Sequence, residues 1–85
     1  MYELIFDDEA IEFLNKLPKD VRQRIFNKIV STKENPLRFF ERLTGRGDYK
    51  LRVGDYRAIA DIDPGNAMVK ITFLGHRKNV YKNLN

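Results

Sequence analysis

The stretch that decides the fold is residues 48–57, which read DYKLRVGDYR. Side chains of a β-strand alternate between two faces. The first, third and fifth residues of the first strand form an apolar face: Tyr49, Leu51 and Val53. The residues between them, Lys50 and Arg52, are basic. Gly54-Asp55 is a two-residue turn of the Gly-X kind, which predicts a β-hairpin with Arg52 opposite Arg57. Like charges in that position repel, so we expect an anion, with phosphate the obvious candidate, to bind there.

A second hairpin extends the same two faces. Asp63-Pro64-Gly65-Asn66 is a strong turn signal. If Ile62 pairs with Ala67, Thr72 lies opposite Arg57. The apolar face then gains seven residues: Tyr56, Ala58, Ala60, Ile62, Val69, Ile71 and Phe73. The other face gains Ile59, Asp61, Thr72 and Leu74, and its cations are Lys50, Arg52, Arg57 and Lys70. We therefore predict that helices cover the apolar face and that the cationic face stays open.

The N-terminal half supplies those helices. Residues 2–6 are short, apolar and β-prone, which predicts a strand. Helical spacing of apolar residues predicts helices at 8–17 and at about 19–34, separated by Pro18 and ended by Asn35-Pro36. Residues 37–43 are a connector whose Phe39, Phe40 and Leu43 pack under the helices. A base-stacking platform is the alternative for Phe39-Phe40. The basic residues of the second helix are interpreted as a solvated face, with contact to nucleic acid as the alternative: Arg22, Arg24, Lys28 and Lys33.

The predicted fold class is α+β, a small antiparallel sheet with two N-terminal helices packed on one face. We expect residues 1–85 to form one domain and residues 76–85 to form a short tail or helical turn. The chain has no cysteine, so a disulfide or a thiolate site is excluded. No apolar run reaches the roughly 18 residues of a membrane span, and the acidic N-terminus is unlike a signal peptide, which predicts a cytoplasmic protein.

The positive charge is confined to the second half of the chain. Residues 1–45 hold eight basic and eight acidic residues, whereas residues 46–85 hold eight basic and four acidic, which accounts for the net +4. A basic half of this kind indicates a polyanionic partner. The alternative is an ordinary solvated surface.

At this point the pattern resembles a known family. A strand, two helices, the motif YKLRVGDYR at 49–57, an apolar strand and the motif GHRKNVY at 75–81 together resemble the RelE/ParE toxin superfamily over essentially the whole chain. Within it the residues are similar to the RelE branch. Those members are ribosome-dependent endoribonucleases that cut messenger RNA in the A site and are silenced by a cognate antitoxin. The resemblance implies a toxin of a type II toxin–antitoxin system, a RelB-like antitoxin partner, the ribosome as a second partner, and no metal or cofactor.

The resemblance also implies site residues. Lys50, Arg57, Arg77 and Tyr81 fall on catalytic positions of the family motifs. Around them we expect residues that bind nucleic acid: Arg46, Arg52, Lys70, His76 and Lys78. Bacterial members often carry another lysine where this chain has Asp48. The positive charge at the site is therefore smaller, or Arg46 or Arg52 supplies it instead.

The chemistry of RNA cleavage without metal agrees with these residue types. The 2′-OH attacks the adjacent phosphate, which needs a base, cations to stabilise the phosphorane and an acid for the departing 5′-oxygen. Lys50 serves as the base or as a charge stabiliser; Arg52 and Arg57 disfavour its charged form, and a phosphate favours it. Arg57 and Arg77 suit phosphate clamping because a guanidinium binds two oxygens at once, and ion pairing with Asp48, Asp55 or Asp61 is their alternative. Tyr81 stacks a base or closes the core edge, and His76 is a proton-transfer residue, a phosphate contact or a packing contact.

Two other functions stay open. The first is a ParE-like inhibitor that binds DNA gyrase without cutting nucleic acid, although the set of Lys50, Arg57, Arg77 and Tyr81 argues against it. The second is a non-catalytic subunit that acts with an antitoxin as a repressor, a reading that Asp48 supports. Because the chain is rich in cations but poor in acid–base groups, we expect the ribosome to position the substrate.

Overall fold

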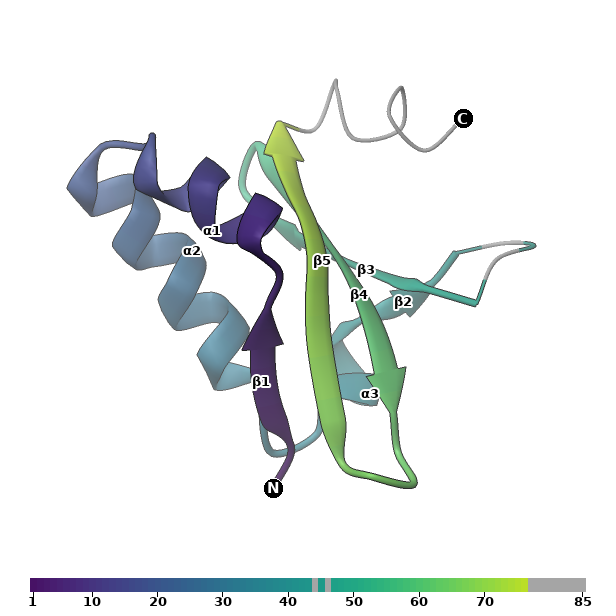
Figure 1. The fold of residues 1–85 in the computed structure, drawn as a ribbon. Helices are drawn as coiled ribbons and strands as arrows, with labels where there is room; N and C mark the ends of the chain where they lie inside the picture. The colour runs from purple at the N-terminus through teal and green to yellow at the C-terminus, as the bar shows by residue number, and fades with distance from the viewer. Residues whose placement is uncertain (44, 46, 77–85) are drawn as a thin grey trace.

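The fold is a five-stranded sheet with two helices on one face (Figure 1). The computed structural model describes residues 1–43, 45 and 47–76. Its elements follow in chain order: β1 Glu3–Phe6, α1 Asp8–Asn15, α2 Lys19–Ser31, α3 Pro36–Phe39, β2 Glu41–Arg42, β3 Tyr49–Val53, β4 Tyr56–Asp63 and β5 Met68–His76. The predicted α+β class and the two helices on one face are confirmed. Within the described residues no helix is long and apolar enough to cross a membrane.

The sheet has the order β1-β5-β4-β3-β2. Its pairings are antiparallel except that β1 runs parallel to β5, with Leu4 beside Val69 and Phe6 beside Ile71. The prediction of an all-antiparallel sheet is therefore wrong for β1, the strand at this edge of the sheet. Parallel neighbours need a long crossover between them, and here the helices and the β2–β4 segment provide it.

Helices α1 and α2 pack on the apolar face of the sheet, as the periodicity predicts. The core contains residues from both layers: Ala10, Leu14, Ile25, Ile29, Phe40, Leu51, Val53, Ala58, Ala60, Val69, Ile71 and Leu74. Helix α2 ends at Ser31, three residues before the predicted end. The hydroxyl of Thr32 then donates to the carbonyl of Ile29 at 2.6 Å, which satisfies a buried polar side chain at the helix end.

The second hairpin differs from its predicted register. Ile62 pairs with Val69 rather than Ala67, and Asp63 pairs with Met68. Ala67 instead belongs to the turn, where its φ of 52° is left-handed and its N–H donates to the carbonyl of Pro64 at 3.2 Å. The turn therefore has the predicted length but lies one residue further along the chain, at 64–67 instead of 63–66.

A β-bulge in β5 changes the faces again. Ile59 pairs with Phe73 and Ala60 with Ile71, so Thr72 is the extra residue. Beyond the bulge Leu74, paired with Ala58, is buried at 3% exposure, whereas Phe73 is only partly buried and does not belong to the core. The prediction placed Phe73 in the core and Leu74 outside, and it was wrong because it assumed uninterrupted alternation.

Residues 37–43 are more ordered than the predicted connector. They contain part of α3 and the short strand β2, which pairs with β3 through Glu41 and Lys50. Phe40 is buried at 5% exposure, as predicted, but Phe39 is 43% exposed. The expectation that Phe39 packs under the helices is therefore wrong. Phe40 follows the helix in an extended conformation, with φ −85° and ψ 140°, so the two rings face different surroundings.

Candidate nucleic-acid site

The β3–β4 hairpin places the predicted cations on the sheet face opposite the helices. Its register is the predicted one, with Val53 opposite Tyr56 and Arg52 opposite Arg57. Gly54 has a φ of 60°, which the turn requires and which a side chain would disfavour. Lys50 lies opposite Ile59, so it is a diagonal neighbour of Arg57 at about 7–8 Å.

These cations line one surface pocket of about 220 Å³, which we call the basic pocket. The residues that line it are Lys28, Phe39, Glu41, Lys50, Leu51, Arg52 and Arg57. They come from α2, α3, β2, β3 and β4, so the sheet edge and the connector build the pocket together. Four cations and one carboxylate around a recess favour a ligand with several negative charges.

Lys50 is held at the edge of the basic pocket by an acidic neighbour. Its Nζ lies 3.5 Å from Oε2 of Glu41, its partner across β2 and β3. The Lys50 side chain is 27% exposed and that of Glu41 is 78% exposed, so solvent screens the pair. The pair orients the ammonium without removing it from the reach of a ligand.

Arg57 is the most buried cation of the basic pocket, at 8% exposure. Ile59, two residues further along the same face, is 1% exposed. The cationic face is therefore less open than predicted. Arg52 remains exposed, and its Nε donates to the carbonyl of Gly54 at 3.4 Å. A buried guanidinium has few rotamers left, which suits an arginine that fixes the position of a bound phosphate.

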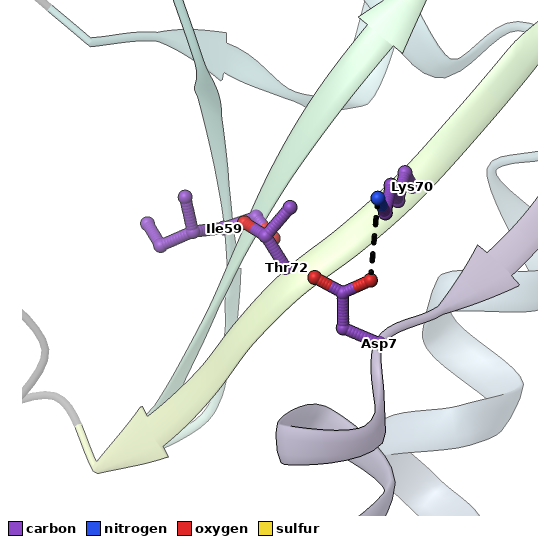
Figure 2. Close-up of polar contacts among 4 residues, drawn as sticks. All are labelled: Asp7, Ile59, Lys70 and Thr72. Atoms are coloured by element: carbon purple, nitrogen blue, oxygen red, sulfur yellow. Dashed lines mark hydrogen bonds and ion pairs between the residues drawn. The ribbon is translucent and has the colours of Figure 1, made fainter.

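Lys70 lies on the same face but outside the basic pocket. It pairs with Asp61 on β4 and its Nζ lies 3.5 Å from Oδ1 of Asp7 (Figure 2). At ordinary strand and residue spacings its backbone is about 12 Å from that of Lys50. The structure therefore groups Lys70 with the start of α1 rather than with Lys50 and Arg57.

Thr72 was predicted to lie opposite Arg57, but Gly75 occupies that position. As the extra residue of the bulge, Thr72 instead turns to the neighbouring strand. Its hydroxyl donates to the carbonyl of Ile59 at 3.3 Å, and Figure 2 shows the two residues side by side. This bond replaces part of the ladder that the bulge interrupts.

His76 lies on the face that the helices cover. It pairs with Tyr56, and the two rings are 5.0 Å apart between centroids. Tyr56 in turn contacts Phe13 of α1 with centroids 6.1 Å apart. Of the three roles considered for His76, the structure therefore shows the packing contact. This histidine lies on the opposite side of the sheet from Lys50 and Arg57.

Four predicted site residues lie outside the described residues: Arg46, Arg77, Lys78 and Tyr81. Their roles stay predictions that follow from the family motifs. Conversely, the basic pocket contains four residues that the sequence did not assign to it, namely Lys28, Phe39, Glu41 and Leu51. Signals for two of them were present in the sequence, since contact with nucleic acid was the alternative for Lys28 and a base-stacking platform was the alternative for Phe39.

A second, larger hollow of about 440 Å³ lies at the helices. Apolar residues such as Phe6, Ile11, Leu14 and Phe26 line it, with Arg22 as its cation. This hollow lacks the grouping of several cations that a phosphate chain needs. The basic pocket is the better candidate for RNA despite its smaller volume.

A family model describes nearly the whole chain. The model for the ParE toxin of the type II toxin–antitoxin system parDE matches residues 4–81. The chain belongs to the ParE toxin family. It is thus a type II toxin of the RelE/ParE superfamily, as the motifs at 49–57 and 75–81 predicted. No curated protein matches its sequence.

Solved structures place this ParE-family toxin among RelE folds. The toxin–antitoxin complex RelBE2 of Mycobacterium tuberculosis matches with a TM-score of 0.79 and 28% identity, covering 89% of this chain and 98% of that chain. The intact Escherichia coli RelBE complex matches with a TM-score of 0.76 and 26% identity over 89% and 96%. The isolated E. coli RelE toxin matches with a TM-score of 0.76 and 26% identity over 99% and 95%. The similarity extends over both layers of the fold.

Proposed function

We propose that this toxin is a metal-independent endoribonuclease that cleaves messenger RNA in the ribosomal A site. The observation that carries the proposal is the convergence of Lys50, Arg52 and Arg57 in one pocket on one face of the sheet. A phosphodiester bound there meets three cations from two strands. The similarity to RelE structures supports the same reading.

The reaction begins when the 2′-OH of one nucleotide attacks the adjacent phosphorus. The 2′-OH loses its proton to water as it attacks, and the bond from phosphorus to the 5′-oxygen breaks. The 5′-oxygen takes up a proton from water, which leaves a 2′,3′-cyclic phosphate and a 5′-hydroxyl end. The guanidinium of Arg57 binds two phosphate oxygens and stabilises the charge that grows on them in the phosphorane. Only 8% of Arg57 is exposed, so solvent screens this interaction less than it would at the surface.

Lys50 acts beside Arg57 on the same phosphate. Its ammonium already pairs with the carboxylate of Glu41, so we assign Lys50 to charge stabilisation in preference to proton removal. By the family motifs, Arg77 and Tyr81 contribute a second phosphate contact and a stacking ring. His76 takes no part in this scheme, because its ring packs against Tyr56 on the other face.

The ribosome and an antitoxin are the proposed partners. The described part of the basic pocket supplies charge without a pair of histidines or carboxylates for proton transfer, so positioning by the ribosome has to provide part of the rate. Two of the solved structures above are complexes of a toxin with its antitoxin, which supports a RelB-like partner that silences this chain.

The test is to add the purified toxin to ribosomes programmed with a defined message and to map the new 5′ ends. The proposal expects cuts within the A-site codon, and expects Arg57→Lys to cut more slowly than the wild type. Intact message under conditions where the folded protein binds ribosomes would contradict it.

Gyrase inhibition is the second candidate, because the matching family model takes its name from ParE. This function needs a protein-binding surface and no phosphate clamp. A supercoiling assay with purified gyrase separates the two candidates. Inhibition of supercoiling without any cleavage of message would favour this second function. If the protein neither inhibits supercoiling nor cleaves message, the non-catalytic subunit is favoured.

A further inference from the structure

Phe39 is an exposed aromatic residue on an anchored segment. It ends α3, a single helical turn whose first residue, Pro36, is buried. The next residue, Phe40, is 5% exposed and belongs to the core, and its N–H donates to the carbonyl of Pro36 at 2.9 Å. Both ends of the turn are therefore fixed, and Phe39 is held outward at 43% exposure.

The ring of Phe39 lies among cations. Nζ of Lys28 is 5.6 Å from the ring centroid and Cζ of Arg38 is 5.9 Å from it. The same ring lines the basic pocket together with Arg52 and Arg57. Single exposed hydrophobic residues are common and need no explanation. A flat ring beside several phosphate-binding cations, however, is the combination with which proteins hold single-stranded nucleic acid.

We propose that Phe39 is a stacking platform for one base of a single-stranded RNA whose phosphate lies on Arg52 and Arg57. The inference deepens the proposed function and rests on it for the identity of the ligand. An incoming base displaces Lys28 or Arg38 from the ring, and the displaced cation becomes available to a phosphate. The exchange is favourable, because a stacked base is worth more than an exposed cation–π contact.

The first test uses fluorescence. The chain contains no tryptophan, so Phe39→Trp introduces a single reporter. Titration with a short single-stranded RNA of mixed sequence is expected to quench its emission in a saturable way. The matched control is Phe26→Trp, since Phe26 is 42% exposed and lines the apolar hollow at the helices. Equal quenching at both positions would overturn the inference.

The second test measures binding of the same RNA, fluorescein-labelled, by anisotropy. Phe39→Ala and Phe39→Leu are expected to weaken binding by about 5- to 150-fold, and Phe39→Trp to retain it. Phe39→Leu preserves an apolar side chain, so its loss of affinity reports on stacking rather than folding. Wild-type affinity in both Phe39→Ala and Phe39→Leu would overturn the inference.

These outcomes are separable from failure of the proposed function. If the wild type cuts messages on ribosomes while Phe39→Leu binds RNA normally, the proposed stacking on Phe39 is wrong and the proposed ribonuclease activity is supported. If the wild type cuts no message while Phe39→Leu loses RNA affinity, the proposed ribonuclease activity is wrong and the proposed stacking on Phe39 is supported.

Discussion

Lys50 and Glu41 are partners across β2 and β3, with Nζ 3.5 Å from Oε2 at the edge of the basic pocket. A phosphate that binds Lys50 must compete with this carboxylate. Glu41→Gln removes the competitor, so we expect RNA affinity to rise at low salt by up to about fivefold, the range of an exposed ion pair. Fluorescence anisotropy with labelled single-stranded RNA measures the change.

Glu34→Gln is the matched control for that variant, because Glu34 is also exposed but lies outside the basic pocket. We expect it to raise affinity less than Glu41→Gln does. A fall in affinity in Glu41→Gln would contradict the arrangement, since it would make the carboxylate part of the binding surface.

Arg57 is expected to act through its shape as well as its charge. Arg57→Lys keeps the charge but loses the two-oxygen contact, so cleavage should fall further than binding. Arg57→Ala should also reduce the slope of log affinity against log salt concentration by about one, which is the contribution of one phosphate contact. Binding isotherms at several salt concentrations and single-turnover cleavage measure both effects, with thermal melts to confirm folding of a variant at a site only 8% exposed. An unchanged salt slope in Arg57→Ala would remove Arg57 from the site.

Arg52 and Lys70 share a sheet face, yet we expect different effects. Arg52 lines the basic pocket, whereas Lys70 pairs with Asp7 about two strands away. Arg52→Ala should therefore weaken RNA binding more than Lys70→Ala does. Because the Lys70 side chain is 51% exposed, loss of its ion pair should cost no more than about 1 kcal/mol of stability. Chemical denaturation and anisotropy on the same samples test both points, and a larger binding defect in Lys70→Ala would shift the site towards β1.

Ala67 offers a test of the second turn. Its φ of 52° is unfavourable for a residue with a side chain. Glycine adopts this conformation without strain but loses more backbone entropy on folding. We expect Ala67→Gly to raise the free energy of unfolding by about 0.5–1 kcal/mol, measured by urea denaturation. Destabilisation by a similar amount would show that Ala67 belongs to the strand, as the sequence had suggested.

The bulge at Thr72 predicts which deletions the sheet tolerates. Deleting Thr72 leaves Ile71 and Leu74 on the core face and should cost about 1 kcal/mol, mainly its hydrogen bond to Ile59. Deleting Lys70 moves Ile71 to the outer face if the turn is kept, at about 2–5 kcal/mol. Thermal melts of the two deletions are the comparison, and equal destabilisation would argue against the bulge.

The parts of the fold that could be predicted from the sequence are those whose geometry depends on a local signal. The turn at Gly54-Asp55 determines the register of β3 and β4, so Lys50, Arg52 and Arg57 came together as predicted. Helical spacing likewise placed α1 and α2 to within a few residues, and the two motifs identified the superfamily.

The remainder depends on tertiary structure. The register of β5 changes because the turn lies one residue further along the chain, so that it includes Ala67, and because Thr72 is an extra strand residue. Neither change has a distinctive composition. The two-residue strand β2 exists because β3 offers a free edge, which propensity does not reveal. Phe39 and Phe40 are identical in type and adjacent in sequence, and only the backbone conformation at the end of α3 decides which ring is buried.

The central claim is that RNA binds at the basic pocket rather than at the helices. Its most direct test is an NMR titration of the isotope-labelled protein with a short single-stranded RNA at low salt. We predict that the largest amide shifts occur at Phe39, Glu41, Lys50, Arg52 and Arg57. Shifts confined to the hollow formed by Ile11, Arg22 and Phe26, with β3 and β4 unchanged, would contradict the claim.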